Sequence, residues 1–274
     1  MMLRPYCCTH CGFWQRRSAL PTACPVCEDF RHPLPPRGYD FADAARIDRE
    51  YRSDLREVLP RLWQVRTTPQ LGIGSCGLLL VTDVGNLHFE GAGWYSDAAL
   101  ERIAELGGVR WQAFSHAHVL GAGWRVDEHF SPRTVVQDRQ LPWAQALNVT
   151  LAFDAVWDLS ADLSLHHTAG HTPGHTVLFW KSRRLLFCGD ALKFELDAHP
   201  VGRAVGVSCH KAFDAHIPLT HGDVRGYREV MEPLDFDGVV TPWEVVASGG
   251  KAAAMRLLDA QLAGDPFADV LELA

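Results

Sequence analysis

The chain has 274 residues, of which 47% are hydrophobic and 22% are charged, and its formal net charge is −7. This composition is ordinary for a globular protein, and the length allows one large domain and a small module. Because the chain has no lysine- and arginine-rich run, no apolar stretch of about 20 residues and no signal-peptide core, we expect a cytoplasmic protein without a nucleic-acid or membrane partner, whose oligomeric state stays open.

Cysteines crowd the start of the chain. Cys8 and Cys11 form one C-x-x-C pair, Cys24 and Cys27 form a second pair, and Cys7 lies beside the first. Each pair places two thiolates on one tight turn, so the two turns together complete a tetrahedral site with four sulfur ligands. Free or redox-active cysteines are the alternative. Cys7 is either a bystander or competes with Cys8 as a ligand.

The metal of this four-cysteine module stays open between zinc and iron. The form Cys-x-x-Cys-Gly followed by Cys-Pro-x-Cys resembles both zinc ribbons and rubredoxin-type knuckles, and the same thiolate cage holds either ion. A segment of about 30 residues buries too little apolar surface to fold alone, so the bound metal supplies folding free energy. We favour a structural zinc as that metal. We assign residues 1–36 to the module and residues 37–274 to the large domain, with the proline-rich Arg31–Asp40 as linker.

The large domain is predicted to combine strands and helices. Apolar residues between Phe41 and Leu59 follow a helical spacing that Pro60 ends. We expect helices at Asp97–Leu106, Tyr227–Leu234 and Lys251–Ala263, and strands at Arg61–Thr67, Gly77–Thr82, Asn86–Phe89, Trp111–Ser115, Arg133–Gln137, Leu163–Thr168, Thr176–Trp180, Leu185–Cys188 and Gly238–Thr241. This pattern favours an α/β fold of stacked sheets with helices outside.

Three segments of the large domain carry candidate metal ligands. His116 and His118 follow an apolar strand, and alternate residues of an extended segment point the same way. His171 and His175 lie in a turn rich in glycine and proline, and Asp190 follows another apolar strand. A lone histidine is more often a structural residue than a ligand. Three such segments at strand ends together predict one metal site.

These segments together resemble the metallo-β-lactamase superfamily over about residues 60–265. The resemblance lies in His116-x-His118, in Gly170-His171-Thr172-Pro173-Gly174-His175 and in Phe187-x-Gly189-Asp190. It implies a four-layer αββα sandwich with a metal site at one end of the sheets. The family commonly hydrolyses thioesters, lactones, β-lactams or phosphoesters and also contains redox enzymes. By the same resemblance, His116, His118 and His171 hold the first metal, Asp190 bridges to a second, and His175 orients the loop.

The sequence departs from the family at the second metal. The family pattern H-x-H-x-D-H has aspartate and histidine where this chain has Leu120 and Gly121, and Trp243 stands where a late strand normally carries the last histidine. None of these three side chains offers a lone pair to a cation. We therefore predict no second ion, with Glu244 and Asp127–His129 as weaker candidates for replacing the lost ligands.

The remaining ligands His116, His118, His171 and Asp190 suffice for one zinc, iron or manganese ion, unless the site holds no metal at all. Our leading hypothesis is a mononuclear metal-dependent hydrolase of a small ester, thioester or lactone, with Asp190 and His118 as catalytic residues. A degenerate relative that binds a ligand or partner without chemistry is the second. The third is a mononuclear iron oxidoreductase fed by the four-cysteine module, because two histidines and Asp190 form a set similar to that of the persulfide dioxygenases.

Overall fold

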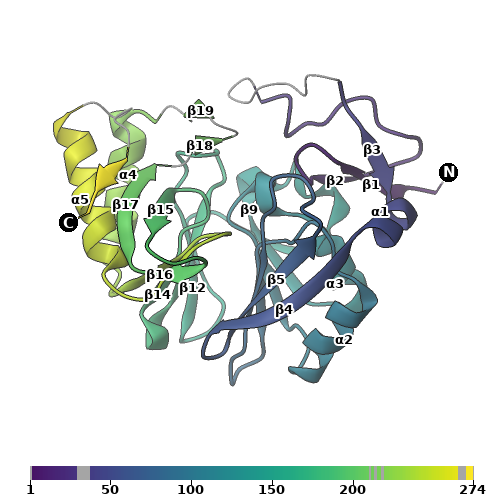
Figure 1. The fold of residues 1–274 in the computed structure, drawn as a ribbon, viewed down its shortest axis with the longest axis horizontal. Coiled ribbons are helices and arrows are strands. Elements are labelled where there is room, and N and C mark those ends of the chain that lie inside the picture. Colours follow the sequence, from purple (N-terminus) through teal and green to yellow (C-terminus); the bar gives the residue numbers. More distant parts are fainter. Residues whose placement is uncertain are drawn as a thin grey trace. The chain divides into compact units, whose positions relative to one another are not determined.

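The computed structural model describes residues 2–29, 38–209, 211–212, 215–216, 219–264 and 270–273. Contacts between residues divide the chain into two compact units (Figure 1). Unit 1 consists of Met1–Val136 and Gln140–Ala152, and unit 2 of Gln137–Arg139 and Phe153–Ala274. The predicted domain boundary at residues 36 and 37 lies outside the described residues, so this division stays a prediction.

The N-terminal module is held together by a three-stranded antiparallel sheet in the order β2-β1-β3. The strands are β1 (Arg4–Cys8), β2 (Trp14–Arg17) and β3 (Phe41–Asp43). Cys7 of β1 lies opposite Trp14 on one side and Ala42 on the other. A strand that follows the predicted linker thus completes the sheet that carries the first cysteines.

The helix predicted across Phe41–Leu59 is wrong for most of its length. Only α1 (Ala44–Glu50) is helical, with the Asp43 side chain accepting a hydrogen bond from the Arg46 N–H at 2.8 Å as its cap. After it comes β4 (Arg52–Leu59), which pairs antiparallel with β5 (Leu62–Thr68). Pairing with β5 gives the backbone N–H and C=O groups of this segment their hydrogen-bond partners. A helix in its place would have depended on tertiary packing for its stability.

Unit 1 contains a seven-stranded sheet in the order β10-β9-β8-β7-β6-β5-β4. Its other strands are β6 (Gly77–Leu80), β7 (Leu87–Phe89), β8 (Trp111–Ala113), β9 (Arg133–Gln137) and β10 (Val149–Phe153), and its helices include α2 (Asp97–Glu105) and α3 (Gly123–Phe130). The predicted strands from Gly77 to Gln137 are confirmed. Because β7 and β8 run parallel, the residues that follow them meet at the same edge of the sheet.

Unit 2 contains a second seven-stranded sheet, in the order β11-β12-β13-β14-β20-β21-β16. Its strands are β11 (Val156–Asp158), β12 (Leu163–His167), β13 (Thr176–Trp180), β14 (Leu185–Phe187), β20 (Gly238–Val240), β21 (Val245–Val246) and β16 (Val201–Gly202). Strands β12 and β14 are both antiparallel to β13, and β20 is parallel to β14. The carboxyl ends of β12, β14 and β20 therefore share one edge.

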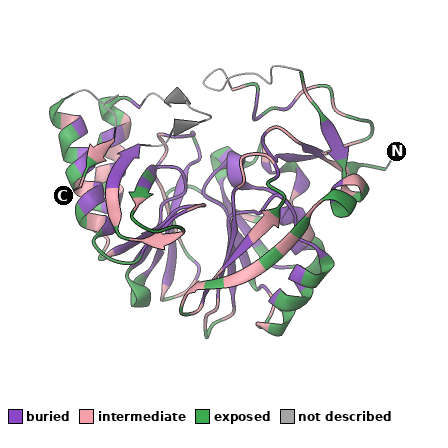
Figure 2. Ribbon diagram, viewed as in Figure 1, coloured by how far each residue is buried: buried purple, intermediate pink, exposed green. Residues whose placement is uncertain are grey.

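The helices of unit 2 are α4 (His221–Met231) and α5 (Gly250–Ala263), which bury one side and expose the other (Figure 2). Helix α4 begins earlier than predicted, because Thr220 and Asp223 form a capping box at its start. A smaller sheet joins β15 (Leu192–Leu196), β17 (Ala204–Cys209) and β22 (Leu271–Glu272), and β18 (Lys211–Ala212) pairs with β19 (Ala215–His216).

Each unit thus contains one seven-stranded sheet and helices packed on it, the mixed α/β content expected of the αββα sandwich. In unit 1, Leu79 of β6 shares a fully buried cluster with Ile103 of α2 and Val126 of α3. In unit 2, Leu186 of β14 does so with Leu258 of α5. Among the helices of the described residues, none combines the length and the apolar character needed to cross a membrane.

A buried histidine in the core of unit 1 makes stability depend on pH. His88 is fully buried, its Nε2 lies 2.6 Å from the Tyr95 hydroxyl oxygen, and burial lowers its pKa to about 3. In the unfolded chain the pKa is about 6.5, so this group's contribution to stability is complete above that pH and is lost as pH falls toward 3.

We therefore expect the unfolding free energy of the wild type to fall by about 2 kcal/mol more than that of His88→Gln between pH 7 and pH 5. The difference arises because only the wild type gains a proton at this position on unfolding. Urea unfolding of both proteins at the two pH values measures it. An identical pH dependence in the two proteins would show that His88 is already protonated in the native state.

Candidate functional site

The four predicted cysteine ligands come together in unit 1. The Cys8 and Cys27 sulfurs lie 3.9 Å apart, the Cys11 and Cys24 sulfurs lie 3.6 Å apart, and all four are within 4.8 Å of one another and buried. A tetrahedron with metal–sulfur bonds of about 2.3 Å has edges of about 3.8 Å, so these spacings fit one four-coordinate ion. All four cysteines are free thiols, which rules out disulfides within this cluster.

The backbone turns of the module explain how the cysteines converge. The Gly12 N–H donates to the Cys8 carbonyl oxygen at 2.8 Å, and Gly12 takes a φ of +86°, which favours glycine. Hydrogen bonds from the neighbouring cysteines, that of Cys11 first, lower the pKa of Cys8, and a metal binds the thiolate form. Cys7 instead packs in the core of unit 1, where burial raises the pKa of its thiol.

The first histidine pair lies in unit 1 at the carboxyl end of β8. His116 is extended, but Ala117–Val119 is a turn of 3₁₀ helix, so the predicted extended pairing of His116 and His118 is wrong in its backbone reason. The turn nevertheless leaves the two rings with centroids 4.8 Å apart. The Ser115 Oγ lies 2.9 Å from Nδ1 of His116, which makes Nε2 the candidate ligand atom.

A buried acid that sequence reasoning missed holds this histidine pair in place. Glu90 follows β7, and its carboxylate accepts a hydrogen bond from the Ser115 N–H at 2.9 Å. On the other side, Gln140 donates from Nε2 to the Ser115 carbonyl oxygen at 2.9 Å. Glu90 adopts a φ of +62°, a costly conformation for a residue with a side chain. An acid directly after an apolar strand was the signal in the sequence.

The second pair, His171 and Asp190, lies in unit 2 at the shared edge of its sheet. The Nε2 of His171 is 3.7 Å from Oδ2 of Asp190, and both side chains are almost completely buried. This spacing is close to the roughly 3.4 Å between two ligands of one tetrahedral zinc. The His171 N–H donates to the Tyr227 hydroxyl oxygen at 2.7 Å, and His175 Nδ1 lies 2.7 Å from Thr168 Oγ1.

Comparison with known families decides what these two pairs belong to. A model described as the metallo-beta-lactamase superfamily matches residues 98–239, more than half of the 274 residues. The chain belongs to the metallo-β-lactamase superfamily. The matched segment contains both pairs, His116 with His118 and His171 with Asp190, which supports the resemblance seen in the sequence.

Individual relatives of this superfamily are distant. The uncharacterized protein YmaE of Bacillus subtilis (strain 168) is 23% identical over 243 residues, which cover 85% of this chain and 86% of that protein. The mono-zinc form of the metallo-β-lactamase FIM-1 from Pseudomonas aeruginosa matches with a TM-score of 0.55 and 14% identity over 77% of this chain and 97% of its own. A metallo-β-lactamase from Hirschia baltica gives a TM-score of 0.54 and 14% identity, over 76% and 96%. These structures show the fold alone.

At Gly121, one of the positions where the superfamily carries a second-metal ligand, backbone atoms pack too closely for a side chain. A side chain at Gly121 would start 2.4 Å from the Ala92 carbonyl oxygen, and one at Gly91 would start 2.1 Å from the Leu120 carbonyl oxygen. Hydrogen bonds from Gly91 N–H to Val119 and from Ala122 N–H to Ala92, at 2.6 and 2.8 Å, hold these segments together. Gly121 is therefore a packing requirement, and an imidazole does not fit there.

The candidate replacements for the lost ligands already have structural roles. The Asp127 carboxylate accepts hydrogen bonds from Thr134 Oγ1 and from the Asn148 N–H, each at 2.6 Å. Glu244 is buried and accepts a hydrogen bond from the Thr241 hydroxyl. Burial is also the main cause that raises the pKa of Glu244, with a smaller contribution from the charge of Asp190. The negative charge of Asp190 thus acts on Glu244, the nearby buried acid of unit 2.

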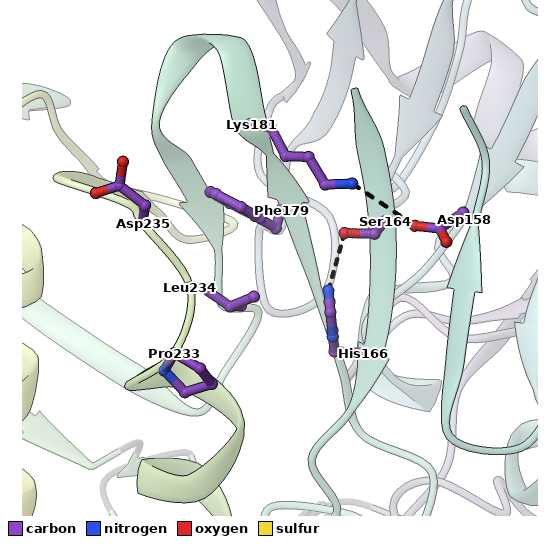
Figure 3. Close-up of a pocket in the computed structure, with 8 residues that line it drawn as sticks. All are labelled: Asp158, Ser164, His166, Phe179, Lys181, Pro233, Leu234 and Asp235. Atoms are coloured by element: carbon purple, nitrogen blue, oxygen red, sulfur yellow. Dashed lines mark hydrogen bonds and ion pairs between the residues drawn. The ribbon is translucent and has the colours of Figure 1, made fainter. Parts of the chain in front are cut away.

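A separate pocket of about 400 Å³ lies in unit 2 (Figure 3). Ser164 Oγ lies 2.8 Å from His166 Nε2 there, and Lys181 Nζ lies 3.8 Å from an Asp158 oxygen. His166 is part of β12, as the sequence predicts for a sheet residue, and burial lowers its pKa. His166 belongs to neither candidate metal pair and serves below as a control position.

Proposed function

We propose that the two pairs form one metal site, with His116, His118, His171 and Asp190 as its ligands, and that the protein is a mononuclear metal-dependent hydrolase. Membership of the metallo-β-lactamase superfamily supports the joining of the pairs, because its metal sites take ligands from these same motifs. The observation that carries the mononuclear proposal is the packing of Gly121 on Ala92, which occupies the position of a second-metal ligand. The mono-zinc form of FIM-1 is a relative in fold with a single-metal state.

The proposed reaction is hydrolysis of a small ester, thioester or lactone. When bound, one ion at these residues lowers the pKa of water toward about 7 and polarises a carbonyl. Asp190, within reach of the His171 imidazole, takes up the proton of the attacking water, while His118 and His116 hold their part of the site. The water oxygen then bonds to the carbonyl carbon, the bond to the alkoxide or thiolate breaks, and the proton passes to the leaving group.

Elemental analysis of the purified protein and of His171→Ala tests this proposal. We expect two ions per wild-type chain, one in each cluster, and one per His171→Ala chain. His166→Ala, a change at a half-buried histidine on strand β12, should keep both ions. A panel of aryl esters, thioesters and lactones should show turnover that His171→Ala lowers by at least about a hundredfold. A wild-type protein with only one ion would contradict the proposed site.

The purified wild-type protein also distinguishes the two alternative functions, the iron oxidoreductase and the non-catalytic relative. Zinc in the four-cysteine cluster leaves the aerobic protein colourless and excludes electron supply through the module, whereas an iron tetrathiolate is red when oxidised. Two bound ions without turnover on any ester, thioester or lactone would favour the degenerate relative that binds a ligand or partner. Zinc, iron and manganese are distinguished directly by the elemental analysis.

A further inference from the structure

A short segment of unit 1, the bridging segment Gly91–Gly93, lies between the N-terminal module and the candidate histidine ligands. On the module side, Trp14 of β2 donates a hydrogen bond from Nε1 to the Gly93 carbonyl oxygen at 3.1 Å. The Trp14 ring also stacks on Trp94, with centroids 5.5 Å apart, and contacts the Trp124 ring at 5.4 Å. Strand β2, which lies between the two cysteine knuckles in the sequence, thus contacts this segment through Trp14.

On its other side, the bridging segment packs against residues 115–122, here named the histidine loop. The backbones meet through Gly91 N–H to Val119 at 2.6 Å and Ala122 N–H to Ala92 at 2.8 Å. The glycines at 91 and 121 allow this approach, since a side chain on either would overlap backbone atoms. A contact of backbone on backbone has no flexible side chains to absorb a displacement, so movement of the segment moves the loop.

A second connection between the module and the bridging segment starts at the first cysteine knuckle, the turn that contains Cys11 and Gly12. A side chain on Gly72 would begin 2.2 Å from the Gly12 nitrogen and 2.3 Å from the Cys11 carbonyl carbon. The Ile73 N–H donates to the Cys11 carbonyl oxygen at 3.4 Å. Two residues after Ile73, Ser75 Oγ donates to the Gly91 carbonyl oxygen at 2.9 Å. The loop that touches the knuckle therefore also touches the bridging segment.

We propose that metal binding to the four-cysteine cluster positions the histidine loop, and with it His116 and His118, through the bridging segment. The ion holds Cys8, Cys11, Cys24 and Cys27 together, which holds the knuckle backbone against Gly72 and Trp14 against Gly93. Loss of the ion releases both contacts. Thermodynamic linkage makes the coupling reciprocal, so an ion at the histidines tightens metal binding by the cysteines. The inference rests on the proposed function only in treating the histidines as ligands.

Hydrogen–deuterium exchange of the full-length wild type and of Cys27→Ser tests the coupling. Cys27 is a ligand of the second knuckle, so its replacement leaves Cys11 and Gly12 chemically unchanged. We expect loss of the cluster's ion and at least about tenfold faster exchange in peptides that cover residues 90–93 and 115–122. Peptides of β13 and β14 in unit 2 should exchange at the wild-type rate. Loss of the ion with unchanged exchange in the histidine loop overturns the proposal.

If Cys27→Ser raises hydrogen exchange throughout the chain and not only in the histidine loop, a matched pair of glycine variants tests the coupling. Gly72→Ala keeps all four cysteines but forces the first cysteine knuckle away from its contact. Gly38→Ala has a similar φ of +77°, and no atom of the described residues lies within 4 Å of the new methyl group. We expect the histidine loop to exchange at least about fivefold faster in Gly72→Ala than in Gly38→Ala. Equal exchange in the two variants overturns the proposal.

The exchange measurement is independent of the proposed function. Peptides of the histidine loop report its mobility whether or not an ion occupies the histidines. Elemental analysis of the wild type separately counts that second ion. A wild-type protein with only the ion of the four-cysteine cluster contradicts the proposed hydrolase, while faster loop exchange in Cys27→Ser still supports the coupling.

Discussion

A histidine in place of Gly121 is expected to lower the free energy of unfolding by about 3 kcal/mol and to add no metal ion. Gly121 has a φ of +46°, where a residue with a side chain costs roughly 1–2 kcal/mol. Its new Cβ would lie 2.4 Å from the Ala92 carbonyl oxygen, and such overpacking costs a further 1–3 kcal/mol, roughly. Denaturant unfolding and elemental analysis of the variant measure both effects.

Gly249→His is the matched control for this substitution. Gly249 also has a positive φ, +75°, but within the part of the chain that the structure describes nothing lies within 4 Å of a Cβ built there. Gly249→His should therefore lose only the backbone cost of roughly 1–2 kcal/mol and keep the wild-type number of ions. The prediction would be wrong if Gly121→His were as stable as Gly249→His and bound one more ion per chain. That result would show that the backbone at position 121 can accommodate a ligand for a second metal.

Serine in place of Cys8 is expected to remove the ion of the four-cysteine cluster, whereas serine in place of Cys7 should leave it bound. The Cys8 sulfur is part of the four-sulfur cluster, while Cys7 lies in the core between Trp14 and Ala42. A structural zinc contributes roughly 10–16 kcal/mol in small zinc-binding peptides, so losing one ligand weakens binding by orders of magnitude. Burying a hydroxyl at Cys7 costs only about 1–3 kcal/mol.

The adjacent pair of substitutions makes a sharp test, because the two cysteines differ by one position and are equally buried. Elemental analysis gives the ion count, and thermal unfolding with and without chelator gives the stability that depends on the metal. We expect chelator to lower the melting temperature of Cys7→Ser but to leave that of Cys8→Ser unchanged. The reverse result would make Cys7 the ligand and shift the register of the first knuckle.

Most of the strands follow from local patterns, since runs such as Thr176–Trp180 combine apolar side chains with β-branched residues and have turn residues beside them. The segment Phe41–Leu59 is the exception. Its apolar spacing suits a helix, yet the pairing of β4 with β5 outweighs the local preference after Glu50. Hydrogen bonds to a partner strand are set by residues elsewhere in the chain, so no local pattern contains them.

The candidate ligands are predictable for a different reason. Thiolate, imidazole and carboxylate are properties of residue type, and the C-x-x-C spacing by itself places Cys8 near Cys11. The histidine pair at 116 and 118 was found from its spacing although its backbone is a 3₁₀ turn and not a strand. Glu90 was missed because its importance depends on a hydrogen bond to Ser115, which is distant in sequence.

By itself, the sequence determined which side chains can bind metal and which positions, Leu120 and Gly121, cannot, because the presence of a lone pair depends only on residue type. Only the tertiary structure decided why position 121 is glycine and how the module reaches the histidine loop. Both depend on backbone segments that pack within a few ångströms of each other, Gly91 on Gly121 and Gly72 on Gly12, and such approaches arise when the chain folds and leave no pattern in residue spacing.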